Sequence, residues 1–196
     1  MKPTTVLPLL FVSLFVTFGC SSGNDSTKKA EKINDERIDK QAIAVSNDAK
    51  EEAKTVSRNM VKLANTSLTE YELSKVALPK ATNPEVRAYA QRVMNDHQQD
   101  DKSLQSLAKQ MNVTLPVGLS DEGKNHLGKL TGMKAGTEFD LQYLENMVSA
   151  NDDAIDTAED LLDHAPNDAA KTFAKKVLSD DKKHKDQAKQ LKNVLD

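Results

Sequence analysis

Two histidines of this sequence each stand three positions from an aspartate. His97 is followed by Asp100, and Asp181 is followed by His184. Residues three apart on a helix share a face, so each His can act with its carboxylate on a single centre. Imidazole and carboxylate groups together suit divalent Zn, Mn or Fe. The two pairs therefore indicate a candidate site for a divalent transition metal ion.

Two further polar residues, Glu70 and Asn151, interrupt apolar helical stripes. Di-iron helical bundles use a Glu on each of two helices and a Glu-x-x-His motif on each of the other two. Here Glu70 would be one such Glu, Asn151 stands at the position of the second, and the two Asp–His pairs replace the motifs. Asn is a poor metal ligand, and Asp is one methylene shorter than Glu. The pattern therefore predicts at most a degenerate di-metal site.

These polar residues are open to three interpretations. Buried His and carboxylate groups need partners, because an unpaired charge in a core is costly. The partners can be one another, in a network of His–Asp and His–Glu hydrogen bonds that fixes helix register. They can also be one bound metal ion, or a redox-active di-metal centre. The candidate ligands are Glu70, His97, Asp100, Asp181 and His184, with Asn151 as the polar position of the third long helix.

Four long helices are predicted to position these side chains. Apolar residues recur at spacings of three and four over residues 52–78, 84–112, 137–164 and 167–194. Glycine, which interrupts helices, is absent from 24–117 and from 137 to the end. Five of the 7 glycines lie in 118–136. That stretch is predicted to be a crossover with a short helix over 120–130.

The polar residues fall near the middle of each predicted helix. At a rise of about 1.5 Å per residue, Glu70 and His97 lie roughly 15 and 20 Å from the turn that joins their helices. Asn151 and His184 lie roughly 20 to 25 Å from the second turn by the same rise. The prediction is an all-α fold, an antiparallel four-helix bundle over residues 51–196 with the polar residues in one central layer.

The second and fourth predicted helices resemble each other in sequence. Residues 87–96 align without gaps with residues 171–180, and His97 then matches Asp181 while Asp100 matches His184. This alignment fits a bundle built from two related helical hairpins.

The N-terminal segment resembles an export signal. Lys2 precedes an apolar run over residues 6–18, which is too short to span a bilayer, since a helix needs about 20 residues for that. The only cysteine, Cys20, follows directly, as in bacterial lipoprotein signals, where this residue is lipidated. Residues 1–19 are therefore predicted to be a lipoprotein-type signal peptide, and Ser21 resembles the sorting residue of outer-membrane lipoproteins. The alternative is an ordinary signal peptide that leaves a free thiol.

Residues 20–50 are polar and mixed in charge, and are predicted to be a tether, partly helical towards its end. The expected partner is the membrane itself, to which the lipid anchor would attach the protein. The protein would then face the periplasm. A mean hydropathy of -0.60 excludes a polytopic membrane protein. The net charge of -3 offers no basic face for nucleic acid.

Motifs of the common enzyme classes are missing from the sequence. There is no Gly-x-Ser-x-Gly, no phosphate-binding glycine loop and no His-Glu-x-x-His. The one cysteine belongs to the predicted lipid signal. No catalytic residue is therefore predicted, and an enzymatic function is not expected.

Several segments resemble one family of bacterial proteins. They are Leu68-Thr-Glu-Tyr-Glu-Leu-Ser-Lys-Val-Ala77, Asn83-Pro-Glu-Val86, Val93-Met-Asn-Asp-His97, Glu138-Phe-Asp-Leu-Gln-Tyr143 and His184. The sequence thus resembles the "domain of unknown function 4142" family over about residues 55–195. The resemblance implies a bacterial envelope protein with a ferritin-like four-helix bundle, of the kind labelled predicted outer membrane protein. It implies no established reaction.

The chain departs from this family at two positions. Members usually carry a His where this chain has Asn151, and Leu-Pro where it has Leu178-Ser179. The first departure removes a potential metal ligand. The functional prediction is accordingly a cell-envelope lipoprotein with a binding or structural role, in a process such as envelope stress. The alternative prediction is a bundle that binds Fe, Mn or Zn.

Overall fold

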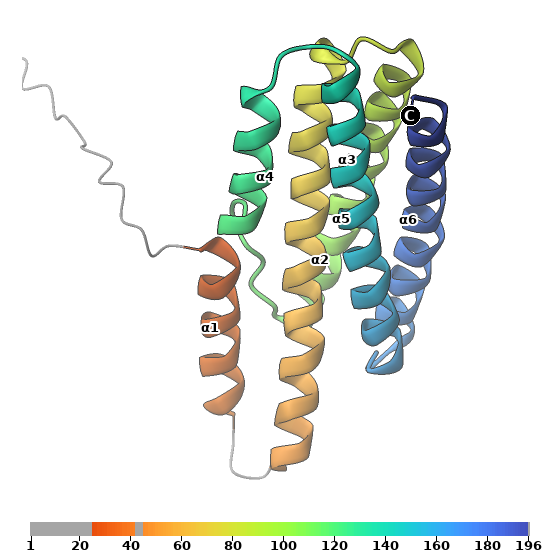
Figure 1. Ribbon diagram of the computed structural model, residues 1–196. Coiled ribbons are helices and arrows are strands. Elements are labelled where there is room, and N and C mark those ends of the chain that lie inside the picture. Colours follow the sequence, from red (N-terminus) through yellow and green to blue (C-terminus); the bar gives the residue numbers. More distant parts are fainter. Residues whose placement is uncertain (1–24, 42–44, 196) are drawn as a thin grey trace, which may run out of the picture.

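The computed structural model describes residues 25–41 and 45–195 (Figure 1). Over these residues it contains six α-helices and no β-strand, which confirms the all-α class. The helices are α1 (Ser26–Asp39), α2 (Asn47–Lys80), α3 (Pro84–Met111), α4 (Asp121–Gly132), α5 (Thr137–Asp163) and α6 (Asp168–Leu195). The predicted ranges of the four long helices and of the short helix agree with α2 to α6, most closely at the ends of α3, α5 and α6.

Helix α2 is longer than predicted at both ends. Its N-terminus lies at Asn47, where the Ser46 hydroxyl accepts a hydrogen bond from the backbone N–H of Ala49. This N-cap stabilises a first turn whose residues are too polar to show an apolar stripe. At the other end Pro79 lies inside the last turn. A proline there removes only one hydrogen bond, so the helix reaches Lys80 before it ends.

The four long helices lie side by side (Figure 1). Short turns join α2 to α3 and α5 to α6, so each pair runs antiparallel. Helix α2 packs against α3 and α5, and α6 packs against the same two helices. Helix α4 belongs to the long connection from α3 to α5 and packs along α2. The close approach of α4 to α2 needs a glycine at position 123, since a Cβ there would lie 2.8 Å from Thr69 Oγ1.

The apolar core has two parts with polar residues between them. One part gathers side chains such as Met60, Leu104, Leu161 and Phe173. The other gathers Leu73, Val93, Tyr143, Met147 and Ala188. Each of the four long helices has inward polar residues that fall between these two groups in sequence: Glu70, His97 and Asp100, Asn151, and Asp181 and His184. The structure therefore brings the inward polar residues of the sequence into one central layer.

The predicted tether over residues 20–50 is wrong for residues 26–39. These residues form α1, which packs on α2 and buries Ala30, Asn34 and Ile38. The Asn34 side chain accepts from the backbone N–H of Thr114 at 2.8 Å and donates to the Thr114 carbonyl at 2.9 Å. Three inward positions at a spacing of four residues suffice to dock this helix. Its high charge conceals that short stripe in the sequence.

The predicted signal peptide and Cys20 lie outside the described residues. Within the described part of the chain, no helix combines the length and the apolar character that crossing a membrane requires.

Candidate metal centre

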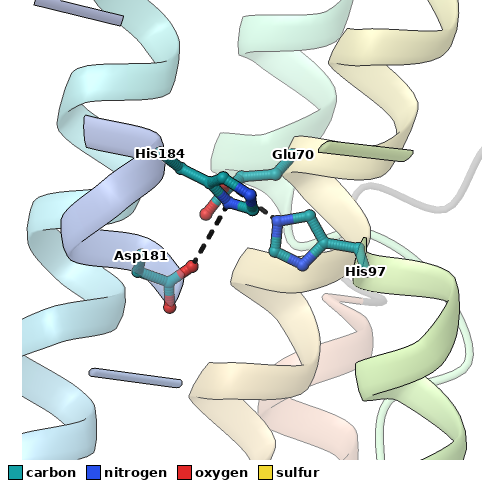
Figure 2. A group of neighbouring side chains, drawn as sticks. All are labelled: Glu70, His97, Asp181 and His184. Atoms are coloured by element: carbon teal, nitrogen blue, oxygen red, sulfur yellow. Dashed lines mark hydrogen bonds and ion pairs between the residues drawn. The ribbon is translucent and has the colours of Figure 1, made fainter. Parts of the chain in front are cut away.

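Four buried side chains from three helices converge in the polar layer (Figure 2). Glu70 comes from α2, His97 from α3, and Asp181 and His184 from α6. Each offers one ligand atom, and these atoms all lie within 4.8 Å of one another. Glu70 is 0% exposed and the other three side chains belong to residues at most 6% exposed. Two imidazoles and two carboxylates thus face one point in the core.

His97 is hydrogen-bonded through both ring nitrogens. Its Nε2 lies 3.0 Å from Glu70 Oε2, and its Nδ1 lies 3.0 Å from Ser67 Oγ. Burial lowers the pKa of His97, but the charge and hydrogen bond of Glu70 outweigh burial. With smaller contributions from Asp181 and Asp100, the pKa of His97 rises to about 9. In the absence of a metal, this ring is therefore a cation paired with Glu70.

His184 has a partner on one side only. Its Nε2 lies 3.0 Å from Asp96 Oδ2, and because a carboxylate accepts, Nε2 carries the proton. Its Nδ1 faces Asp181 Oδ1 at 3.9 Å, which is too long for a hydrogen bond. Nδ1 therefore faces the centre of the layer without a hydrogen-bond partner among the described residues. The ring centroids of His97 and His184 lie 5.6 Å apart.

Asp181 is held in its neutral form by its surroundings. Burial, and after it the charge of Glu70, raises the pKa of Asp181 to about 8, although His97 acts in the opposite direction. A carboxyl group in such a place becomes charged when a cation binds beside it. Binding of a metal ion here would thus release protons from the layer.

Three buried acceptor atoms of this layer have no hydrogen-bond partner among the described residues. They are Glu70 Oε1, Asn151 Oδ1 and His184 Nδ1. Buried polar atoms in native proteins almost always have a partner, so three such atoms together need an explanation. All three can act as ligand atoms and none receives a hydrogen bond from the described residues, which is the situation that a bound cation corrects.

Asn151 lies in the same layer and orients Glu70. Its Nδ2 donates to Glu70 Oε2 at 3.1 Å and to the Met147 carbonyl at 2.6 Å. The amide group thereby holds the Glu70 side chain from the α5 side. Its position agrees with the polar site predicted for the third long helix.

Asp100 does not belong to the group of four converging side chains. Its carboxylate is paired with the Lys176 ammonium of α6, which also contacts Asp180 Oδ2 at 2.9 Å. The expectation that Asp100 joins the ligand group is therefore corrected. The cause is the lysine on the neighbouring helix, whose charge Asp100 neutralises at the edge of the layer.

A small cavity adjoins three of the four side chains, those of Glu70, His97 and Asp181. Its volume is about 20 Å³, and its polar lining comes from Ser67, Glu70, His97, Asp100 and Asp181. A space of this size holds about one water molecule or one ion. The layer therefore has room for a single small occupant.

Comparison with known proteins identifies the family. The sequence model described as Domain of unknown function (DUF4142) matches residues 41–191. The chain belongs to the DUF4142 family. No curated protein has a sequence that matches this DUF4142 chain.

Two solved structures have a similar fold. A DUF305 fragment from Deinococcus radiodurans has a TM-score of 0.60 at 13% identity, covering 72% of this chain and 95% of that one. A DUF305 protein from Streptomyces coelicolor, whose name describes it as secreted, has a TM-score of 0.59 at 12% identity, covering 69% and 89% of the two chains. At such low identity, these similarities concern the fold alone.

Two site residues of the DUF4142 chain escape prediction from sequence. Ser67 lies three residues before Glu70 on the same stripe of α2, and Asp96 directly precedes His97. Each contacts one of the two imidazole rings from outside. The sequence contains a signal for Ser67, because it is a small polar residue on an otherwise apolar stripe. It contains no such signal for Asp96, since this residue is half-exposed and its partner lies on another helix.

Proposed function

We propose that this protein binds one divalent transition metal ion in its central polar layer. The ligands would be Glu70, His97, Asp181 and His184. The observation that carries the proposal is the convergence of these four buried side chains around acceptor atoms without donors. Each imidazole also has an outer hydrogen-bond partner, which is the usual arrangement around a metal-binding His.

The donor set favours one ion over two. Two imidazole nitrogens and two carboxylates suit Zn, Mn or Fe. A di-iron site needs carboxylates from all four helices and a His from two of them. Here α5 contributes the amide of Asn151, and Asp100 is engaged by Lys176. The carboxylates required to bridge a second ion are therefore not available in the layer.

The second candidate function is structural. The bonds from Glu70 to His97 and Asn151, and from His184 to Asp96, tie four helices together without any ion. Such a network would fix the register of the helices. It accounts for these bonds, but it leaves the three acceptor atoms without partners.

Metal analysis of protein purified without chelator separates the two functions. Metal binding predicts close to one equivalent of a transition metal, lost in the variants His97→Ala and His184→Ala. The variant His164→Ala is the matched control, because His164 pairs with Glu52 at the surface. Less than about 0.2 equivalents in the wild type, with no thermal shift on adding Fe, Mn or Zn, would leave only the structural function.

The proposed setting is the bacterial envelope, with lipid attached at Cys20 and the helical domain in the periplasm at the outer membrane. The support is the N-terminal pattern of a short apolar run before the only cysteine. Cys20→Ser should move the protein from the membrane to the soluble fraction of cells, whereas an unchanged membrane fraction would refute lipidation. A role in envelope stress stays a prediction.

The proposed fold type is ferritin-like. Support comes from the two antiparallel hairpins, α2–α3 and α5–α6, and from the single long crossover that joins them. Ferritin-like bundles have one such crossover and build their metal sites from side chains of facing helices.

A further inference from the structure

A surface groove lies between α2 and α3, next to the polar layer. Its volume is about 500 Å³, and one wall is the crossover segment Leu115, Pro116 and Val117. Its rim carries Asp101, whose carboxylate accepts a hydrogen bond from Gln105 at 2.7 Å. The groove is therefore open to solvent and carries a negative charge that attracts cations.

The groove and the inner cavity share one wall. Of the described residues that line either space, Ser67 and His97 line both. These two side chains are hydrogen-bonded through Ser67 Oγ and His97 Nδ1 at 3.0 Å. The Ser67–His97 pair therefore stands between solvent and the point where the four ligands meet.

The neighbouring face of the layer, between α3 and α6, is closed by two charged pairs. Asp100 binds Lys176, and Asp96 binds His184 at 3.0 Å, so that α3 is tied to α6 at two positions about one turn of α3 apart. Opening this face would break both pairs between the two helices. On the groove side, rotation of a single ring opens the path: His97 then gives up its ionic bond to Glu70 and its hydrogen bond to Ser67.

We infer that metal ions reach and leave the central layer through the α2–α3 groove, with the Ser67–His97 pair as the gate. The inference rests on the proposed metal binding and adds the path and the moving side chain. His97 then has two roles, because the ring that closes the path is also a ligand of the ion. The crossover wall keeps its place through the Ser26 hydroxyl of α1, which accepts from the backbone N–H groups of Val117 and Gly118.

The test fills the groove with a large side chain and leaves the four ligating residues unchanged. Gln98 lines the groove and is exposed on α3, so Gln98→Trp places a large ring in the path. The control is Lys183→Trp, an equal ring beside His184 on the exposed face of α6, where it lines neither space. Because the chain contains no Trp, the fluorescence of each introduced indole reports whether it is sheltered or in solvent.

Zn²⁺ is the probe. Transfer of Zn²⁺ from the protein to an excess of a chromophoric chelator measures the dissociation rate, and competition titration measures Kd. Since Kd is the ratio of the two rate constants, Gln98→Trp should slow dissociation and association at least about tenfold and leave Kd within about threefold. Lys183→Trp should match the wild type in both measurements.

Two results would contradict the proposal that the Ser67–His97 pair is the gate. One is wild-type dissociation in Gln98→Trp with its indole sheltered, and the other is equal slowing by Lys183→Trp. Failure of the wild type to bind Zn²⁺ in the titration would instead remove the proposed function, and the path with it. The competition titration thus tests the metal site, and the dissociation rates test the path to it.

Discussion

At the scale of single residues, the outer partners of the two imidazoles matter as much as the ligands. Asp96 holds His184 by Nε2, which leaves Nδ1 facing the centre. Ser67 holds His97 by Nδ1, which directs Nε2 towards Glu70. A metal-binding His is usually oriented in this way, and the orienting group also sets its basicity.

Removal of either outer partner should weaken metal binding and preserve the fold. For Ser67→Ala and Asp96→Ala we expect a 10- to 100-fold higher Kd for Zn²⁺, in the range typical of such partners. Competition titration measures the change, and circular dichroism checks the helical content. Gln99→Ala, an exposed change on the same turn of α3, serves as control. Unchanged affinity in both variants would argue against these two rings as ligands.

The stability of the metal-free protein should fall as the pH rises from 6.5 to 9. The pKa of His97 rises from 6.5 to about 9 on folding, and that of Asp181 rises from 3.8 to about 8. The folded state therefore holds more protons than the unfolded chain in this range, so the free energy of unfolding decreases with pH. The stabilisation from His97 is complete below pH 6.5 and is lost as the pH passes 9.

Urea unfolding at several pH values, in the presence of chelator, measures this dependence. At about 1.4 kcal/mol per pKa unit, the rise of the His97 pKa from 6.5 to about 9 accounts for a loss of at most roughly 3 to 4 kcal/mol. The variant His97→Gln should show a flatter pH profile. A wild-type stability that is constant or that increases over this range would contradict the ionic pairing of His97 with Glu70.

At the scale of elements, Asp140 joins the start of α5 to the turn between α2 and α3. Its carboxylate accepts from the backbone N–H groups of Thr82 and Asn83 and from the Thr82 hydroxyl, at 2.7 to 3.1 Å. The residue is 1% exposed. One side chain thus satisfies the backbone donors of the turn before α3 and fixes the α2–α3 hairpin against α5.

Asp140→Ala should destabilise the protein by about 3 kcal/mol, because the N–H groups of Thr82 and Asn83 lose a buried, charged acceptor. Chemical denaturation gives the difference in the free energy of unfolding. Glu138→Ala, an exposed change in the same turn, should be almost neutral. A loss below about 1 kcal/mol for Asp140→Ala would mean that water replaces the carboxylate.

Asn34 joins helix α1 to the segment after α3, much as Asp140 joins α5 to the turn between α2 and α3. Asn34→Ala removes both hydrogen bonds to the Thr114 backbone and leaves those half-buried groups without their partner. A loss of about 2 kcal/mol and faster amide hydrogen exchange at Thr114 are expected. Lys32→Ala, exposed on the opposite face of α1, is the control. Unchanged exchange at Thr114 would show that α1 does not hold the crossover.

At the scale of the whole molecule, the polar layer divides the apolar core into two parts. Without a metal, the layer contributes three buried acceptors that lack partners, which is a cost to folding. An ion bound by α2, α3 and α6 would link three of the four long helices. Metal binding and global stability are thus expected to change together.

Metal should therefore raise the melting temperature. At a free concentration of 100 Kd, the added stability is about 2.7 kcal/mol, which corresponds to roughly 5 to 10 °C for a domain of this size. Thermal unfolding with and without chelator measures the shift, and His184→Ala should abolish it. An equal shift in His184→Ala would place the bound ion elsewhere on the protein.

Sequence patterns predicted much of the architecture. The spacing of apolar residues and the positions of glycine outlined the four long helices and the short crossover helix, because these signals are local. They also singled out Glu70, His97, Asn151, Asp181 and His184, since a polar residue in an apolar stripe stands out at once. The same method failed for α1, whose short inward stripe is concealed by charged neighbours.

By itself, the sequence determined the helical class, the family and the residues that enter the layer. These properties follow from periodicity and motifs within single segments. Only the tertiary structure decided that Asp100 pairs with Lys176, that His184 turns Nδ1 inward, and that Ser67 and His97 stand between groove and cavity. Each of these depends on a partner from another helix, and the distance between two helices is not encoded in the period of either one.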